Sequence, residues 1–196
     1  MPVIAGGVKR AGPVAAAGAA RYKTARIHPV PQGGDMAIKV GDTLPLDLKL
    51  KEMKEGAPKD VALGEVFKGK RVVLFAVPGA FTPTCSMKHL PGFVAEAEKI
   101  RARGVDDVVC VAVNDAFVMD AWGKSSGATG KVRMLGDGNG DFTRAVGLEL
   151  DATGFGMGKR SQRYGMVVKD GKVEQLHVEP GPGLNVCSAE SMLAKL

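Results

Sequence analysis

The sequence predicts an α/β fold in which a central mixed β-sheet is flanked by helices. Two continuous apolar runs, residues 72–77 and 108–113, are typical of strands that are buried on both faces of a sheet. Helical patterns follow both runs, and this alternation favours a mostly parallel sheet. Asp170-Gly171 separates two later apolar runs and is a strong hairpin signal, which adds an antiparallel edge to the sheet.

The other elements follow from periodicity, chain breakers and capping signals. Residues 46–50 alternate leucine with charged residues, the pattern of a half-exposed strand. The remaining strands are expected at 71–77, 108–113, 132–135, 164–169 and 172–178. Helices are expected at 61–67, at 83–103 with a bend near Pro91-Gly92, at 115–124, around 142–146, and after a capping Ser188 near the end of the chain.

The chain divides into a short leader and one domain. Of the net charge of +6, +4 lies in residues 1–35, which hold five basic residues against one acidic residue. Residues 1–34 are rich in Ala and Gly and contain no Asp or Glu, a composition that resembles an organelle transit peptide. The alternative is a disordered tail that targets nothing. We therefore expect a transit peptide or disordered leader at 1–35 and a single domain at 36–196.

Composition excludes several classes of function. The three cysteines are odd in number and include no C-x-x-C pair, which argues against a secreted disulfide scaffold and against a zinc site. No apolar run approaches the roughly 20 residues of a membrane span. Because much of the positive charge lies in the leader, the basic balance does not indicate a nucleic-acid partner. A soluble intracellular protein without a nucleic-acid or membrane partner is expected.

The chain is organised around residues 77–93, V-P-G-A-F-T-P-T-C-S-M-K-H-L-P-G-F. A proline-glycine pair ends the buried strand, and Thr82-Pro83 is a helix-start signal that places Cys85 in the first helical turn. Free backbone N–H groups and the helix dipole favour an anion there, and the thiolate is the nucleophilic form of cysteine. A small, inert buried thiol is the alternative. The strand–turn–helix setting favours a reactive cysteine.

The same stretch carries a family resemblance. Pro78-x-x-x-Thr82-x-x-Cys85 matches the active-site pattern of the peroxiredoxins, and the sequence resembles their type II, peroxiredoxin-5-like (atypical two-cysteine) branch. Ordered matches continue at 113–119, 121–122, 130–133, 160–164 and 178–180, so the resemblance covers roughly 36–196. It implies a thioredoxin-like fold, with which the order of the expected elements agrees, and a homodimer. Gly165 departs from the family, where serine is common at this position.

The resemblance implies roles for five residues. Cys85 would be the peroxidatic cysteine, whose thiolate attacks a peroxide oxygen and becomes a sulfenic acid. Thr82 would hydrogen-bond the thiolate or the peroxide, or simply cap the helix. Pro78 would shield the sulfur from water, or only end the strand. The backbone amides of Thr84 and Cys85 would hold the peroxide. Arg163, which cannot deprotonate, would stabilise negative charge beside the sulfur, unless it is an ordinary solvated arginine.

Three further residues complete the candidate site. His89 lies four residues after Cys85 on the same helix face and is expected to line the pocket, since a metal pair would lack two more ligands. Cys187 matches the resolving position of animal type II proteins and lies in a glycine- and proline-rich segment that looks mobile. Cys110, in a predicted buried strand, matches the candidate proposed for plant-like members. Buried strand cysteines are usually structural, which favours Cys187 without excluding Cys110. Either disulfide needs local unwinding around Cys85.

No cofactor or metal is expected from the remaining motifs. Residues 137–148 begin like a calcium loop but have Phe142 and Leu148 at the sixth and twelfth positions. Gly130-Lys131 lacks the flanking residues of a phosphate loop, and the glycines at 154–158 have the wrong spacing for a dinucleotide site.

The sequence thus predicts a thiol peroxidase for hydrogen peroxide and alkyl hydroperoxides, with an antioxidant role in cell redox homeostasis. Thioredoxin, glutaredoxin or glutathione would regenerate Cys85. The alternative is a peroxide sensor or redox-controlled chaperone that uses the same cysteine. The protein would work in a mitochondrion or plastid if the leader is a transit peptide, and in the cytoplasm otherwise.

Overall fold

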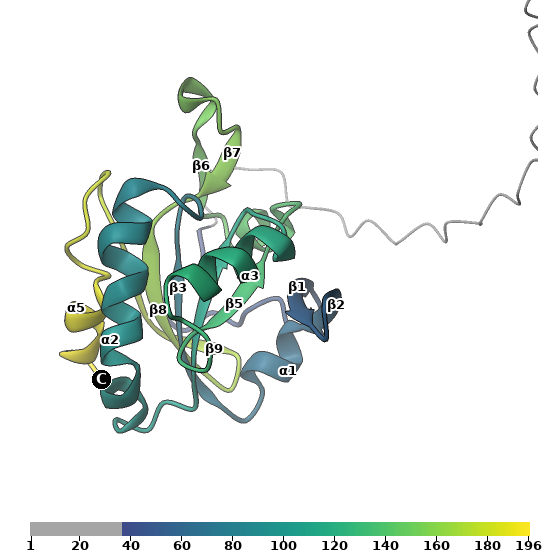
Figure 1. The fold of residues 1–196 in the computed structure, drawn as a ribbon. Helices are drawn as coiled ribbons and strands as arrows, with labels where there is room; N and C mark the ends of the chain where they lie inside the picture. Colours follow the sequence, from purple (N-terminus) through teal and green to yellow (C-terminus); the bar gives the residue numbers. More distant parts are fainter. Residues whose placement is uncertain (1–36) are drawn as a thin grey trace, which may run out of the picture.

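A computed structural model describes residues 37–196, and the predicted leader at 1–35 lies outside these residues. A seven-stranded sheet forms the centre of the molecule, with strand order β2-β1-β5-β4-β3-β8-β9 (Figure 1). β3 (Arg71–Ala76), β4 (Asp107–Ala112) and β5 (Arg133–Gly136) are parallel, whereas β8 (Tyr164–Lys169) pairs antiparallel with β3 and β9 (Lys172–Val178) pairs antiparallel with β8. This is the thioredoxin-like mixed sheet that the sequence predicts.

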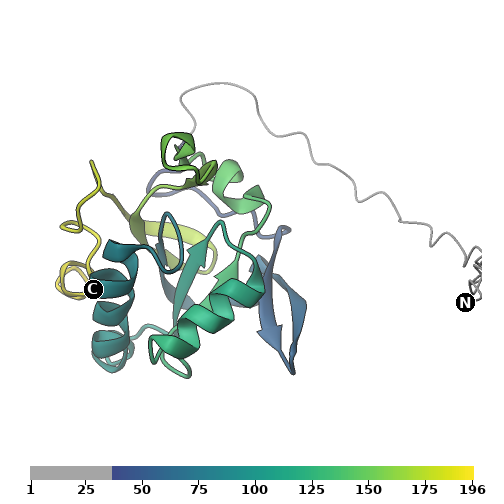
Figure 2. The same cartoon turned by 45° about the horizontal axis from the view of Figure 1, so that its top comes forward.

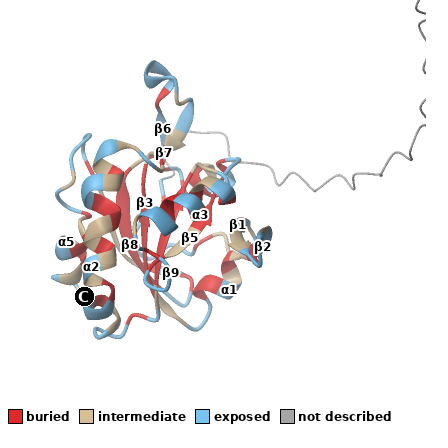
Figure 3. Ribbon diagram, in the orientation of Figure 1, coloured by how far each residue is buried: buried red, intermediate tan, exposed pale blue. Residues whose placement is uncertain are grey.

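Two hydrophobic cores lie on opposite faces of the sheet. Figure 3 shows that the central strands between them are buried. Leu74 of β3 belongs to one core, whereas its neighbour Phe75 belongs to the other. β4 alternates in the same way, and Cys110 lies in the core that also holds Cys85. Because both faces are covered, these strands carry no polar alternation, and this is why they appear as continuous apolar runs.

Helices cover both faces (Figures 1 and 2). α2 (Leu90–Arg101), α3 (Ala116–Ser125) and the C-terminal α5 (Ala189–Leu193) contribute to the core that holds Cys85. The short α1 (Leu63–Phe67) and α4 (Asp141–Ala145) contribute to the opposite core. The expected Ser188 cap is present, since its side chain accepts a hydrogen bond from Ser191 N, and the Asp115 side chain caps α3 by accepting one from Val118 N. None of the helices in residues 37–196 is long and apolar enough to cross a membrane.

Two expected boundaries near the start of the domain are wrong. The predicted strand at 46–50 is displaced to β1 (Lys49–Lys54), and the first part of the predicted helix at 61–67 belongs to β2 (Ala57–Ala62). The two strands form an antiparallel hairpin, which Figure 2 shows in blue at the edge of the sheet. Its turn has positive φ at both Glu55 (53°) and Gly56 (76°), the backbone of a tight hairpin turn. A glutamate in this conformation is uncommon, so the turn gives only a weak sequence signal.

The helix predicted at 83–103 is distorted one turn before the expected position. Residues Cys85–His89 form a π-helical turn, in which Leu90 N donates to Cys85 O, and regular helix resumes at α2. The sequence predicts a bend at Pro91-Gly92 instead. Pro91 lacks an N–H and crowds the carbonyl four residues before it, so the distortion falls on the preceding turn.

A second, two-stranded sheet was not predicted. β6 (Glu149–Asp151) and β7 (Lys159–Ser161) form a hairpin that projects from the body of the molecule (Figure 1), with a single 3-10 turn, η2 (Thr153–Phe155), between them. All three residues of β6 are exposed. A strand that is exposed on both faces has no hydrophobic period, which explains why the sequence does not reveal it.

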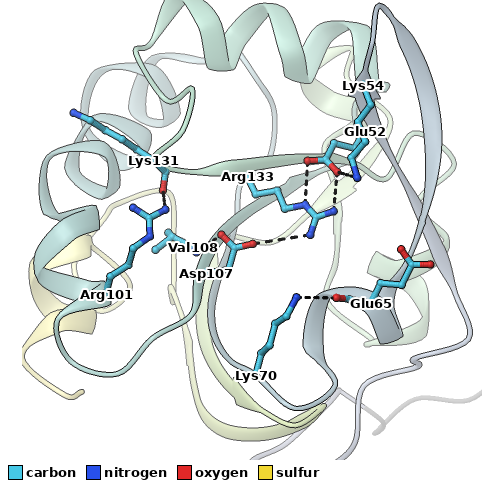
Figure 4. Close-up of polar contacts among 9 residues, drawn as sticks. All are labelled: Glu52, Lys54, Glu65, Lys70, Arg101, Asp107, Val108, Lys131 and Arg133. Carbon is cyan, nitrogen blue, oxygen red and sulfur yellow. Dashed lines mark hydrogen bonds and ion pairs between the residues drawn. The ribbon is translucent and has the colours of Figure 1, made fainter.

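A polar network attaches the β1–β2 hairpin to the rest of the sheet (Figure 4). β1 and β5 share the single register pair Lys51↔Gly136. The side chains of Arg133 and Glu52 add a bidentate pair, with Nε–Oε1 at 3.0 Å and Nη2–Oε2 at 2.7 Å. Burial raises the pKa of Glu52, but hydrogen bonds and charge from Arg133 and Lys54 outweigh it, and the pKa lies below its usual value.

We therefore expect Arg133→Met to lower the free energy of unfolding by roughly 1–3 kcal/mol at pH 7. Because the folded-state pKa of Glu52 is depressed, this contribution is present above the ordinary glutamate pKa and is lost as the pH falls through the folded value. The difference between wild type and variant should therefore shrink at about pH 3. Urea unfolding at both pH values measures it.

Lys99→Met, which breaks an exposed pair with Glu96 on α2, is the matched control and should change stability by less than about 0.5 kcal/mol. Equal effects of the two variants would show that the Arg133 pair has no special structural role.

Candidate active site

Cys85 lies where β3 has ended and the active-site helix begins. Helical backbone starts at Pro83, and Thr82 O accepts the hydrogen bond of Ser86 N at 2.9 Å, as at a helix N-terminus. The Thr84 and Cys85 amides therefore lie in the first turn, where N–H groups have no partner within the helix. Cys85 is fully buried and has no disulfide partner. The parallel strands β3 and β4 end beside this turn, and Asn114 Oδ1 accepts from Ala80 N to join the two loops.

The guanidinium group of Arg163 contacts the sulfur of Cys85. It lies between β7 and β8, is 7% exposed, and its Nη2 is 3.4 Å from Cys85 Sγ. Seventy-eight residues separate the two in sequence, so the pairing of β8 with β3 brings them together. A guanidinium is permanently charged and favours negative charge on an adjacent sulfur. The solvated-arginine alternative is excluded by its burial.

His89 connects Arg163 to the C-terminal segment. Its Nδ1 is 3.1 Å from Arg163 Nη1, and its Nε2 is 3.0 Å from Cys187 O. A guanidinium can only donate, so Nδ1 must accept and the ring proton resides on Nε2, which donates to the carbonyl. Burial, together with the charge of Arg163, lowers the pKa of His89 to about 3. The imidazole is therefore neutral and fixed in one tautomer.

Pro78, Thr82 and Thr84 line a groove of about 650 Å³ that reaches Arg163. The Thr82 hydroxyl donates a hydrogen bond to Gly79 O at 2.9 Å, which closes the loop between β3 and the helix. The remaining wall is mainly apolar and comes from the β6–β7 hairpin and the segment after β9. It consists of Leu150, Ala152, Phe155, Met157, Gln162, Glu179, Pro180, Gly181 and Pro182, with Pro83 beside Thr84.

Both candidate resolving cysteines are buried. Cys110 belongs to the same core as Cys85, and burial raises the pKa of its thiol, with the nearby Cys85 adding to the shift. Cys187 is also fully buried, and its Sγ is 3.8 Å from His89 Nε2. The thiol of Cys187 is therefore packed inside the protein, although the glycine- and proline-rich loop before it is exposed.

Gly165 provides the space that Cys187 occupies. A Cβ at this position would lie 2.9 Å from Met192 Sδ and 3.3 Å from Cys187 Cβ. The departure from the family's common serine therefore fits the way in which α5 and the C-terminal segment pack on β8.

Sequence reasoning missed two residues of the site. Asn114 joins the loops after β3 and β4, and Glu179 accepts backbone hydrogen bonds from the segment that carries Cys187. Both fall inside matched motifs, but their partners are backbone N–H groups outside those motifs, which no residue pattern marks. Arg160 has a supporting role, since it donates to Met157 O and Val113 O beside the active-site loop.

Comparison with known proteins gives consistent matches. The family model Redoxin matches residues 39–193. The chain is 47% identical over 163 residues to peroxiredoxin-2E, chloroplastic, of Arabidopsis thaliana, covering 82% of this chain and 70% of that protein. It is 44% identical over 160 residues to peroxiredoxin-2B of the same plant, covering 81% and 98%.

Solved structures agree. Reduced Prx3 of Vibrio vulnificus in complex with hydrogen peroxide is 48% identical, with a TM-score of 0.77 and coverage of 81% of this chain and 98% of that one. Peroxiredoxin 5 of Alvinella pompejana is 38% identical, with a TM-score of 0.71 and coverage of 80% and 96%. With the buried cysteine, the arginine beside it and these matches, the chain belongs to the Redoxin family and is a peroxiredoxin, a thiol-dependent peroxidase with an antioxidant function.

Proposed function

We propose that Cys85 is the peroxidatic cysteine and that it reduces hydrogen peroxide and alkyl hydroperoxides. The observation that carries this assignment is the 3.4 Å contact between Arg163 Nη2 and Cys85 Sγ at the start of a helix. The thiolate attacks one peroxide oxygen, so an S–O bond forms and the O–O bond breaks. The other oxygen takes a proton and leaves as water or alcohol, and the sulfur remains as a sulfenic acid.

Four neighbours assist this step in the proposal. Arg163 stabilises the thiolate and the charge that develops on the peroxide oxygens. The Thr84 amide offers a hydrogen bond to the peroxide, and the Thr82 hydroxyl can rotate from Gly79 O toward it. Pro78 adds an apolar wall without an N–H. Each of these residues lines the groove that reaches the site.

The groove supports alkyl hydroperoxides as substrates in addition to hydrogen peroxide. Hydrogen peroxide needs only a small polar site, whereas this groove has a volume of about 650 Å³. Its wall includes Leu150, Phe155 and Met157, and apolar walls retain apolar substrate groups. An alkyl tail would lie along the β6–β7 hairpin with its peroxide group toward Arg163.

Regeneration of Cys85 needs a thiol, and we propose Cys187 as the resolving cysteine, with Cys110 as the alternative. Both thiols are buried beside the site, so either disulfide requires local opening. Cys187 is preceded by an exposed loop, whereas Cys110 lies in the middle of the sheet between β3 and β5. Opening the C-terminal segment disrupts less packing than opening β4. Thioredoxin, glutaredoxin or glutathione would then complete the cycle.

We also propose a homodimer and an organellar location. Large apolar side chains are exposed around the active-site helix, at Phe81, Met87 and Phe117, and such residues favour a protein interface. Residues 1–35 have the composition of a transit peptide, and two relatives are named as chloroplastic, which favours a plastid over a mitochondrion.

Cys85→Ser should abolish both peroxide consumption and thiol-linked turnover, because a hydroxyl is not ionised at neutral pH and cannot replace the thiolate. Peroxidase assays with thioredoxin and with glutaredoxin measure this. Cys110→Ser is the control and should retain the first reaction with peroxide. More than a few per cent of wild-type activity in Cys85→Ser would overturn the assignment.

Cys187→Ser should react once with peroxide, lose thioredoxin-linked turnover and overoxidise at lower peroxide concentration. Without a resolving thiol the sulfenic acid persists until a second peroxide attacks it. Peptide mapping of the oxidised wild type should find a Cys85–Cys187 disulfide within one chain. A Cys85–Cys110 disulfide would transfer the role to Cys110, and a glutathione adduct alone would mean that neither cysteine resolves.

A further inference from the structure

The loop before Cys187 is held only at its base. Glu179, which follows β9, is 7% exposed, and Cys187 is fully buried, whereas the residues between them are exposed apart from the half-buried Leu184. The intervening sequence, P-G-P-G-L-N-V, offers few side chains that could anchor it. Whatever keeps Cys187 inside must therefore act at the base of this loop.

A single carboxylate oxygen joins the two ends of the loop. Glu179 Oε1 accepts hydrogen bonds from the backbone N–H groups of Asn185 and Val186, each at 2.7 Å, and of Cys187 at 3.0 Å. Hydrogen bonds to an ionised acceptor are roughly twice as strong as neutral ones. Burial raises the pKa of Glu179, but hydrogen bonds from residues 185–187 outweigh it, so the pKa lies below the ordinary value and the carboxylate is charged at neutral pH.

Glu179 also faces the thiol of Cys187. Burial and, next, the hydrogen bond and charge of this carboxylate raise the pKa of Cys187 far above its usual value. On the other side, His89 Nε2 donates to Cys187 O. Cys187 is thus held at its backbone N–H, its carbonyl and its thiol. These contacts keep the proposed resolving thiol protonated and buried.

We propose that Glu179 is a latch that holds the resolving segment closed and sets how often Cys187 becomes available to Cys85. The inference rests on the proposed resolving role of Cys187, and it names the residue that controls when Cys187 can react. Resolution itself joins the two sulfurs and breaks the S–O bond of the Cys85 sulfenic acid, and the thiol proton leaves with the hydroxyl as water. Glu179 takes no part in that bond exchange, so it is a positioning residue.

Glu179→Gln tests the latch directly. Glutamine keeps the size and one acceptor oxygen but removes the charge, so the three amide contacts weaken. Amide hydrogen exchange of the reduced full-length protein should become at least about tenfold faster at residues 185–187. Amides of β8 should be unchanged. Glu190→Gln, an exposed substitution on α5 in the same segment, is the matched control and should leave all of these rates within twofold. Unchanged exchange at 185–187 in Glu179→Gln would overturn the latch.

The catalytic consequence is measured on the same variants. After one equivalent of hydrogen peroxide, acid quenching and peptide mapping follow the Cys85–Cys187 disulfide over time, and Glu179→Gln should form it at least about fivefold faster than wild type or Glu190→Gln. Faster exchange with an unchanged or slower disulfide rate would overturn control of resolution by Glu179. Suppose that exchange is faster in Glu179→Gln but that neither wild type nor the variant forms a Cys85–Cys187 disulfide. That result would overturn the proposed role of Cys187, whereas the conclusion that Glu179 holds the C-terminal segment closed would remain.

Discussion

The contact between Arg163 and Cys85 is the interaction on which the rest of the site depends. A buried guanidinium is costly unless its charge and N–H groups have partners. Here Nη2 contacts the sulfur and Nη1 contacts His89. The imidazole cannot share the positive charge, because burial and Arg163 itself lower its pKa to about 3. The permanent positive charge of Arg163 therefore lies directly against Cys85 Sγ, where it would stabilise negative charge that develops on the sulfur.

The sheet brings these groups together. β3 leads into the loop and helix that carry Cys85, and β8, paired antiparallel with β3, begins immediately after Arg163. β9 returns beside β8 and ends next to Glu179, whose N–H donates to Arg163 O at 2.9 Å. Cys85, Arg163 and Glu179 thus lie beyond the ends of three adjacent strands, β3, β8 and β9. The C-terminal segment is therefore connected to the surroundings of Cys85 through His89, which contacts Cys187 O, and through Glu179, which contacts Arg163 O.

Local signals explain which parts of this fold can be predicted from the sequence. The apolar runs of β3 and β4, the Asp170-Gly171 turn and the Ser188 cap each depend on neighbouring residues, and all are confirmed. The β6–β7 hairpin is missed because its strands are three residues long and largely exposed.

The site follows the same division. Cys85, Thr82 and Pro78 form one short motif, and Arg163 could be identified only through the family resemblance. Glu179 and the buried state of Cys187 were not foreseen, because they depend on backbone contacts that form only after β9 and α5 have packed.

The account is tested most directly by the second-order rate constant for the reaction of hydrogen peroxide with Cys85 in Arg163→Lys. A lysine keeps the charge but loses the planar fork that reaches both the sulfur and His89. We expect the rate constant to fall by about 100-fold or more. Arg144→Lys, at a partly exposed ion pair with Asp141 on α4, is the unaffected control. The free energy of unfolding should change by less than about 1 kcal/mol. An unchanged rate constant in Arg163→Lys would contradict the account.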